Sequence, residues 1–276
     1  MHDFSVNKRL WDQTDELGLA NRRRLEEARI YCINVMSAPG AGKTTLLERT
    51  LERIAPGPRF GVIEGDIQGR ADADRLERFG IPVRQINTNG ACHLDPRQVA
   101  AALDTMDLGS IDLLVIENVG NLVCPAEFDL GEADRVMLLS VTEGHDKPAK
   151  YPLMFRTADV LILNKIDLLP HTDFDLAEAS RVARVLREGI EILEVSCRTG
   201  EGLDGWIAWL EHRLAHAKEH WDGMPHDHAP GQSHNHDHGP DHSHGPSHRH
   251  DPGPSHDASP GRAPNHRPTG GPASGA

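Results

Sequence analysis

A glycine-rich stretch that ends in a lysine and two threonines carries the clearest chemical signal in the sequence. It reads SAPGAGKTT from Ser37 to Thr45 and fits the phosphate-loop pattern GxxxxGK followed by serine or threonine, except that a serine replaces the first glycine. The glycines of such a loop let backbone N–H groups face phosphate oxygens, the lysine reaches the β- and γ-phosphates, and the first threonine binds magnesium. The stretch therefore predicts a nucleoside triphosphate site. Its members are Gly40, Ala41, Gly42, Lys43, Thr44 and Thr45.

A second motif, NKID, follows an apolar run and predicts which base is bound. The carboxylate of Asp167 can accept from the N1–H and the exocyclic amine of guanine, and adenine offers neither donor there, so a buried carboxylate would reject it. Lys165 would lie along the base plane, and Asn164 would join this loop to the phosphate loop. Ser196 and Cys197 follow the last predicted strand and could offer backbone N–H groups to the guanine O6. We therefore expect GTP as the nucleotide.

Two carboxylates at the ends of predicted strands complete a candidate catalytic set with Lys43. Asp66 ends the segment EGD, and Glu117 ends IDLLVIE. Phosphoryl transfer needs charge neutralisation and a positioned water, so one carboxylate can hold magnesium together with Thr44 while the other orients the attacking water. The sequence does not assign the two roles. The alternative for Asp66 is a helix cap.

Soft and borderline metal ligands lie in two loops. Cys92 and His93 are adjacent on a glycine-containing loop, and Cys124 follows Glu117 in the segment VGNLVCP, where the γ-phosphate would be sensed. Buried cysteines and solvated loop histidines are common, so spacing alone leaves a metal site and an inert pair of loops both open. Three ligands would leave the coordination shell of a metal incomplete. A two-fold dimer could complete a square-planar nickel or a tetrahedral zinc site. Cys32 lies within a predicted strand and is expected in the core.

The end of the sequence is rich in histidine. Eleven of the 18 histidines fall between His226 and His266 among Asp, Pro, Gly and Ser, with almost no large apolar residue. Such a segment is expected to be disordered, and its imidazoles can chelate nickel and similar metals. The alternatives, a purification tag or an inert spacer, fit the interspersed pattern less well. The HxH histidines are His226, His228, His234, His236, His238, His242, His244, His248 and His250.

The elements that must position these residues alternate along the chain. Short apolar runs predict buried strands, and amphipathic stretches between them predict helices. The predicted strands are Ile30–Met36, Phe60–Glu64, Val83–Ile86, Leu113–Glu117, Val136–Val141, Val160–Leu163 and Ile192–Val195. The predicted helices are Val6–Ala28, Lys43–Ile54, Ala71–Phe79, Pro96–Met106, Leu176–Arg187 and Leu203–Ala217. The alternation predicts an α/β fold, a mostly parallel sheet with helices on both faces.

Composition sets the limits of this interpretation. We expect an N-terminal helical segment over residues 1–28, a P-loop GTPase domain over 29–220 and the His-rich tail over 221–276. The net charge is −13, with 42 acidic against 29 basic residues and no basic stripe with aromatics, which argues against nucleic acid as a partner. No run suits a signal peptide or a bilayer span, and the four cysteines form no CxxC pair, so we expect a cytoplasmic protein with reduced thiols.

Four segments in order, SAPGAGKTT, GACHLD, ENVGNLVCPAEFDLGE and NKID, strongly resemble the hydrogenase nickel-incorporation GTPases of the HypB family. The resemblance covers about Asn21 to Ala217. It implies a Rossmann-like P-loop domain of the SIMIBI type that dimerises when GTP binds, with interface metal ligands that match Cys92, His93 and Cys124. The family's role implies that nickel passes to a partner chaperone and the hydrogenase large-subunit precursor as GTP is hydrolysed. A family lysine that couples the dimer to the nucleotide matches Lys147.

The sequence departs from the family in two features. It has no CxxCGC nickel motif, and its His-rich stretch follows the GTPase domain, whereas in members that have one it usually precedes the domain. A urease-type nickel GTPase is the nearest alternative, although the contiguous CPH motif of that group is absent. A nickel-storage protein that acts through its tail is the alternative from another class. The sequence thus favours a slow GTP-hydrolysing nickel metallochaperone for nickel–iron hydrogenase.

Overall fold

A computed structural model describes residues 4–54, 57–67 and 69–223 of the chain. All but the first three residues of the predicted His-rich tail (221–276) lie outside the described residues, so its disorder and the division of the chain into three parts stay predictions. Within the described residues, no helix combines the length and the apolar character that a membrane span would need.

Seven strands form one sheet in the order β3-β2-β4-β1-β5-β6-β7, and every neighbouring pair is parallel. The central strands are buried on both faces, which is why they read as continuous apolar runs rather than as alternating patterns. The chain winds from β1 toward one edge and then, from β5, toward the other, so the strand order reverses beside β1. Ligands of open parallel sheets bind at the carboxyl ends of the strands near such a reversal. The bounds are β1 Tyr31–Ser37, β2 Phe60–Asp66, β3 Val83–Asn87, β4 Leu113–Glu117, β5 Asp134–Ser140, β6 Val160–Asn164 and β7 Glu191–Val195.

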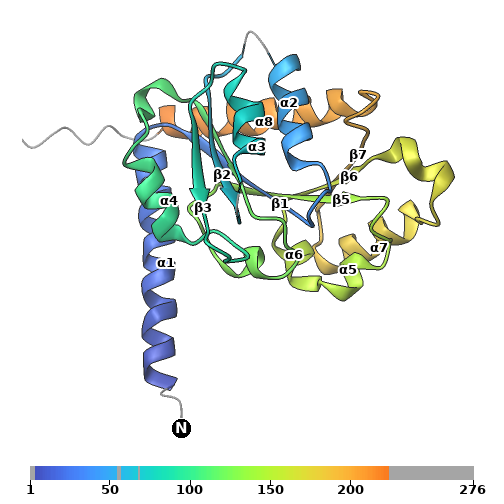
Figure 1. Cartoon of the computed structure of the whole chain (residues 1–276), viewed down its shortest axis with the longest axis horizontal. Helices are drawn as coiled ribbons and strands as arrows, with labels where there is room; N and C mark the ends of the chain where they lie inside the picture. The colour runs from blue at the N-terminus through green and yellow to red at the C-terminus, as the bar shows by residue number, and fades with distance from the viewer. Residues whose placement is uncertain (1–3, 55–56, 68, 224–276) are drawn as a thin grey trace, which may run out of the picture. The chain divides into compact units, whose positions relative to one another are not determined.

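Helices cover both faces, which confirms the predicted α/β class. One face packs against α2 (Lys43–Arg53), α3 (Ala71–Glu77) and α8 (Leu203–Asp222) (Figure 1). The core on this face runs from strand residues such as Val35 to the fully buried indole of Trp206 in α8. The helices of the opposite face are α1 Phe4–Glu27, α4 Pro96–Leu103, α5 Lys147–Lys150, α6 Pro152–Thr157 and α7 Leu176–Leu186.

The N-terminal helix α1 packs against α4 and the loop before β5. The side-chain amide of Asn21 donates to Pro96 O at 2.8 Å and to Leu130 O at 3.1 Å. At Gly18 a Cβ atom would lie 2.4 Å from Asp129 O, so only glycine lets the helix come this close. The part of α1 around Gly18 and Asn21 is therefore held against α4 and the loop before β5 by specific contacts.

Several elements differ from their predictions. Helix α8 extends to Asp222, five residues beyond the predicted end, because buried Trp221 continues its apolar face. Short helices α5 and α6 were not predicted, since each is only about one turn long and begins at or next to a proline. Three 3₁₀ segments were also missed: Leu108–Ser110, Cys124–Glu127 and Ile166–His171.

A paired charge holds α8 at the amino-terminal edge of the sheet. The carboxylate of Asp134, at the start of β5, is buried. It accepts a hydrogen bond from the Tyr31 hydroxyl at 2.5 Å and one from Arg213 Nε at 2.9 Å, and a second Arg213 nitrogen donates to its other oxygen. Burial, and next the charge of Asp134, raise the pKa of Tyr31, so the phenol stays a donor. Both oxygens of this buried carboxylate are therefore partnered.

Candidate functional site

The phosphate loop joins β1 to α2 at the centre of the carboxyl-terminal edge. Gly40 and Gly42 have φ values of 73° and 111°, which residues with side chains rarely adopt. Gly42 caps α2 without a side-chain hydrogen bond, so the first N–H groups of the helix stay open to an anion. Lys43 Nζ lies over the loop and donates to Ser37 Oγ at 3.3 Å. The loop therefore has the backbone that phosphate binding requires.

Two buried glutamates face each other beside this loop. Strand register pairs Glu64 of β2 with Glu117 of β4, and Glu117 Oε1 accepts a hydrogen bond from Thr44 Oγ1 at 2.7 Å. The second oxygen of each glutamate has no partner among the described residues. Burial, with the charge of Glu117 next, raises the pKa of Glu64 to about 8. Burial raises the pKa of Glu117 to about 7 although Lys43 and Thr44 lower it.

These oxygen atoms fit a magnesium ion. Magnesium prefers carboxylate and hydroxyl ligands, and the unpartnered oxygens of Glu64 and Glu117 lie where a cation would satisfy them. Glu64 is absent from the sequence-based candidates. Its signal was an acidic residue in the apolar run FGVIEGD, which a parallel strand buried on both faces should not contain without a function.

Asp66 ends β2, two residues beyond Glu64. Its Oδ1 accepts from the backbone N–H of Ile67 at 2.6 Å, and its side chain is half-buried. Helix α3 begins at Ala71 and its N-cap residue is Arg70, so the helix-cap alternative for Asp66 is wrong. Its catalytic role stays a prediction.

The NKID loop contacts the phosphate loop directly. Asn164 Nδ2 donates to Ala41 O at 2.9 Å across 123 residues of sequence, and Lys165 Nζ donates to Gly40 O at 2.7 Å. Asp167 accepts from Ser196 Oγ at 2.6 Å. A hollow of about 340 Å³ lies between these loops. The predicted base-binding residues thus meet at one place next to the phosphate loop.

The loop after β7 differs in detail from its prediction. The backbone N–H of Cys197 donates to Asn164 Oδ1 at 3.3 Å, and that of Ser196 donates to Glu201 O at 2.9 Å. Neither N–H is therefore free for a base carbonyl in this arrangement, because the loop uses them to hold itself and Asn164. Burial raises the pKa of Cys197 to about 11, so its thiol stays protonated and serves packing.

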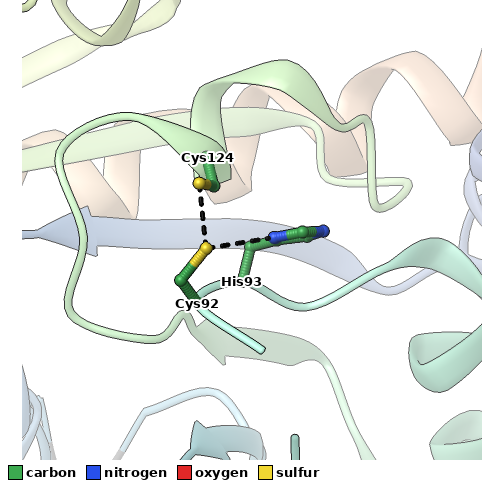
Figure 2. A group of neighbouring side chains, drawn as sticks. All are labelled: Cys92, His93 and Cys124. Carbon is green, nitrogen blue, oxygen red and sulfur yellow. Dashed lines mark hydrogen bonds between the residues drawn. The ribbon is translucent and has the colours of Figure 1, made fainter. Parts of the chain in front are cut away.

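The two loops with soft ligands converge in Figure 2. Cys92 Sγ lies 2.9 Å from Cys124 Sγ and 3.7 Å from His93 Nδ1. In the part of the chain that the structure describes, this is the one group of three such side chains whose ligand atoms lie within 4.8 Å of one another. The His93 ring stacks on Phe128 at 4.2 Å between centroids, and burial lowers the pKa of His93, so the imidazole is neutral and able to bind metal. The hydrogen bond with Cys92, and then burial, raise the pKa of Cys124 to about 11.

Buried amides fix the Cys92–His93 loop to the sheet. Asn118 Oδ1 accepts from the backbone N–H of Leu94 at 3.1 Å, and Asn118 Nδ2 donates to Asn34 Oδ1 at 3.3 Å. Asn34 in turn donates to Glu132 at 3.3 Å, and Arg135 donates to the same Glu132 oxygen at 2.6 Å. Arg135 also donates to the backbone oxygens of the segment that carries Phe128. This network holds both sides of the candidate metal site.

The turn that carries Cys124 is built on the phosphate loop. The backbone N–H of Asn121 donates to Ser37 O at 2.8 Å, while Asn121 Oδ1 accepts from the N–H groups of Val123 and Cys124 at 2.7 and 3.1 Å. At Gly120 a Cβ atom would lie 2.8 Å from Pro39 Cα, so a larger residue would separate the loops. One asparagine therefore connects the phosphate loop to Cys124, a candidate metal ligand.

Two further sets of predicted residues, Lys147 and the tail histidines, are not part of the contact between the phosphate loop and the Cys124 turn. Lys147 begins α5 and lines a hollow with Glu143, whose pKa burial raises. The tail histidines from His226 to His250 lie outside the described residues.

The parallel sheet, the phosphate loop and the NKID loop define a nucleotide-binding protein of the P-loop class. Residues 31–194 match the family described as CobW/HypB/UreG, nucleotide-binding domain. The chain belongs to this family, and proteins named HypB hydrogenase maturation factor are among its relatives.

Three such relatives show how far the similarity extends. The HypB hydrogenase maturation factor of Azotobacter vinelandii is 49% identical over 206 residues, which span 75% of this chain and 68% of that protein. The crystal structure of HypB from Archaeoglobus fulgidus has 40% identity and a TM-score of 0.69, covering 74% of this chain and 99% of that one. HypB from Helicobacter pylori, solved in complex with nickel, has 36% identity and a TM-score of 0.71, covering 74% and 96%.

Proposed function

We propose that the chain is a GTP-hydrolysing nickel metallochaperone that helps to insert nickel into nickel–iron hydrogenase. The observation that carries the proposal is the double contact of Asn121, which bonds Ser37 of the phosphate loop and the backbone of Cys124. A nucleotide that moves the phosphate loop would move a metal ligand with it. The relatives' name, hydrogenase maturation factor, and the nickel complex of the Helicobacter pylori protein support the same role.

GTP is the nucleotide that the base loop fits. The Asp167 carboxylate borders the hollow and can accept two hydrogen bonds from guanine, whereas adenine would leave it unpaired at a cost of about 1–3 kcal/mol or more. Lys165, with φ of 64° and its ammonium on Gly40 O, is placed between the base and phosphate loops.

Hydrolysis would follow the usual P-loop route, in which water attacks the γ-phosphorus and the bond to the β–γ bridging oxygen breaks, giving GDP and phosphate. Thr44, Glu117 and Glu64 would hold magnesium, which neutralises the phosphate charge. Lys43 and the open N–H groups at the start of α2 bind phosphate oxygens. Asp66, at the half-buried end of β2, would orient the water and accept its proton.

Nickel is the cargo in this proposal. The two sulfurs and one imidazole at Cys92, His93 and Cys124 suit nickel or zinc, and three ligands leave positions that a second copy of the chain can fill. GTP would favour the dimer, with Lys147 coupling it to the nucleotide, and hydrolysis would release nickel to a partner chaperone and the hydrogenase large-subunit precursor. Because the ligands must be reduced thiols, we propose the cytoplasm as the site of action. The tail histidines would store nickel.

The test uses a strain that lacks this gene. We expect hydrogenase activity to be lost at low nickel and at least partly restored by excess nickel, with urease unchanged where present. The wild-type gene should restore activity, whereas Lys43→Ala and Cys124→Ser should not.

Each alternative predicts another outcome. Loss of urease instead of hydrogenase would indicate a urease-type GTPase. Full activity of Lys43→Ala would indicate a storage protein and contradict a nucleotide switch.

A further inference from the structure

Helix α8 carries three histidines spaced four residues apart: His212, His216 and His220. All three side chains are exposed. Residues four apart on a helix lie on one face with Cβ atoms about 6 Å apart, and two imidazoles in this arrangement can bind one metal ion. The three histidines make two overlapping pairs that share His216.

The backbone of this face is held in place. Arg213, between the first two histidines, is clamped on Asp134 at the start of β5. On the side that faces the sheet, Trp206 and Trp209 stack at 5.4 Å and are buried. A metal would therefore have to order only side chains and not the chain itself, which limits the entropy cost of binding.

The charges around the histidines favour a cation. The guanidinium of Arg213 is neutralised by Asp134, and Lys218 lies on the opposite side of the helix by its spacing. Glu219 is exposed, falls on the face of His212 and His216, and has no ion pair in the described part of the chain. The last turns of a helix carry partial negative charge, which also attracts cations.

We propose that these histidines form a second metal site for divalent late transition metals such as nickel, with the negative charge of Glu219 favouring the cation. Imidazole ligands suit nickel, copper and zinc. The site is a two-imidazole chelate, because among the described residues only the Cys92 group brings three ligand atoms within 4.8 Å.

The site is separate from the nucleotide. Helix α8 ends at Asp222, which pairs with Arg29 just before β1, so the histidines lie toward the amino-terminal edge of the sheet. The phosphate loop and Cys124 lie at the other edge. Metal binding on α8 therefore depends on neither GTP nor thiols. In the sequence His226 follows His220 by six residues.

The test uses the full chain with the eleven histidines from His226 to His266 replaced by asparagine and with Cys124→Ser. Nickel ions alone are titrated in by calorimetry, with and without GTP. We expect one nickel per chain, bound equally in both conditions, and a histidine signature in X-ray absorption.

Replacing His216 by alanine removes both pairs and should weaken binding at least about tenfold. His212→Ala or His220→Ala leaves one pair and should weaken it about twofold, whereas the double variant should match His216→Ala.

The matched control is His171→Ala, which removes an exposed histidine that has no other histidine four residues away. It should leave nickel affinity unchanged. Alanine on an exposed helix face is well tolerated, so each variant should fold. GTP binding by each variant checks that it does. The proposal is overturned if the tail-substituted chain binds no nickel, or if His216→Ala and His171→Ala bind nickel equally.

Discussion

Buried carboxylates at the two edges of the sheet differ in how they are satisfied. At the amino-terminal edge Asp134 has both oxygens bonded, to Tyr31 and Arg213. At the carboxyl-terminal edge Glu64 and Glu117 each keep one oxygen without a partner among the described residues. A fold normally pairs its buried polar groups, so the difference separates charges that hold the structure from charges that await a ligand.

The unpartnered oxygens of Glu64 and Glu117 at the carboxyl-terminal edge carry an energetic cost until a ligand binds. The raised pKa values of Glu64 and Glu117 mean that burial disfavours the charged form of both, and the charge of Glu117 adds to this effect at Glu64. A magnesium nucleotide that binds only the folded chain would offset this cost and stabilise the protein. Three predictions test the comparison.

The largest effect, on GTP affinity, is expected from Lys43→Ala, which removes the lysine of the phosphate loop at the carboxyl-terminal edge. GTP affinity should fall at least about 1,000-fold, or about 4 kcal/mol, with little change in folding stability. Calorimetry with GTP measures the first and urea unfolding the second. Lys218→Ala, an exposed lysine of α8, is the matched control and should bind GTP normally. Unchanged GTP affinity in Lys43→Ala would contradict the assignment of the phosphate loop.

Arg213→Leu breaks the hydrogen-bond network of Asp134 at the amino-terminal edge of the sheet. Asp134 would then be buried beside Tyr31 without its cation, which should lower the free energy of unfolding by about 3 kcal/mol. GTP affinity of the folded protein should not change. Arg181→Leu, which removes an exposed pair with Glu178, should cost less than about 1 kcal/mol. Equal losses in the two variants would show that the Asp134 network is not a structural clamp.

Glu64→Gln, in contrast, is expected to raise the free energy of unfolding. The pKa of Glu64 is about 8 in the folded chain, above the value of about 4.3 for an unfolded glutamate. The folded state therefore holds an extra proton between these values, and stability is lost as the pH rises toward and through 8. Glutamine cannot ionise, so the nucleotide-free variant should be more stable than wild type by about 1–2 kcal/mol at pH 8.5 and nearly equal at low pH. Urea midpoints at pH 4.5 and 8.5 measure this, and identical pH dependence in both proteins would refute it.

The sequence was sufficient for the fold and for the parts of the site that follow local motifs. All seven strands were predicted, and the central ones gave the strongest signal because strands covered on both faces need continuous apolar runs. The residues of SAPGAGKTT and NKID were found because glycine conformation and polar spacing are local properties. Their contact through Asn164 and Ala41 is present in the structure.

Residues whose importance comes from pairing were missed. Glu64 matters because strand register places it beside Glu117, and register cannot be read from one strand. Asn118 and Asn121 look like ordinary loop amides until their hydrogen bonds join two loops. The α8 histidines were also missed, although His212 and His216 lie four residues apart within the predicted helix Leu203–Ala217; His220 joins them only because the helix extends to Asp222.

The central claim is that the nucleotide controls the metal ligands through Asn121. The most direct measurement is nickel affinity at the Cys92 site, with a non-hydrolysable GTP analogue and with GDP, in a chain whose tail histidines and His216 are replaced. The account predicts at least a tenfold difference between the two nucleotides, about 1.4 kcal/mol of coupling, and a smaller difference in Asn121→Ala with nucleotide affinity retained. Equal nickel affinity with both nucleotides would contradict it.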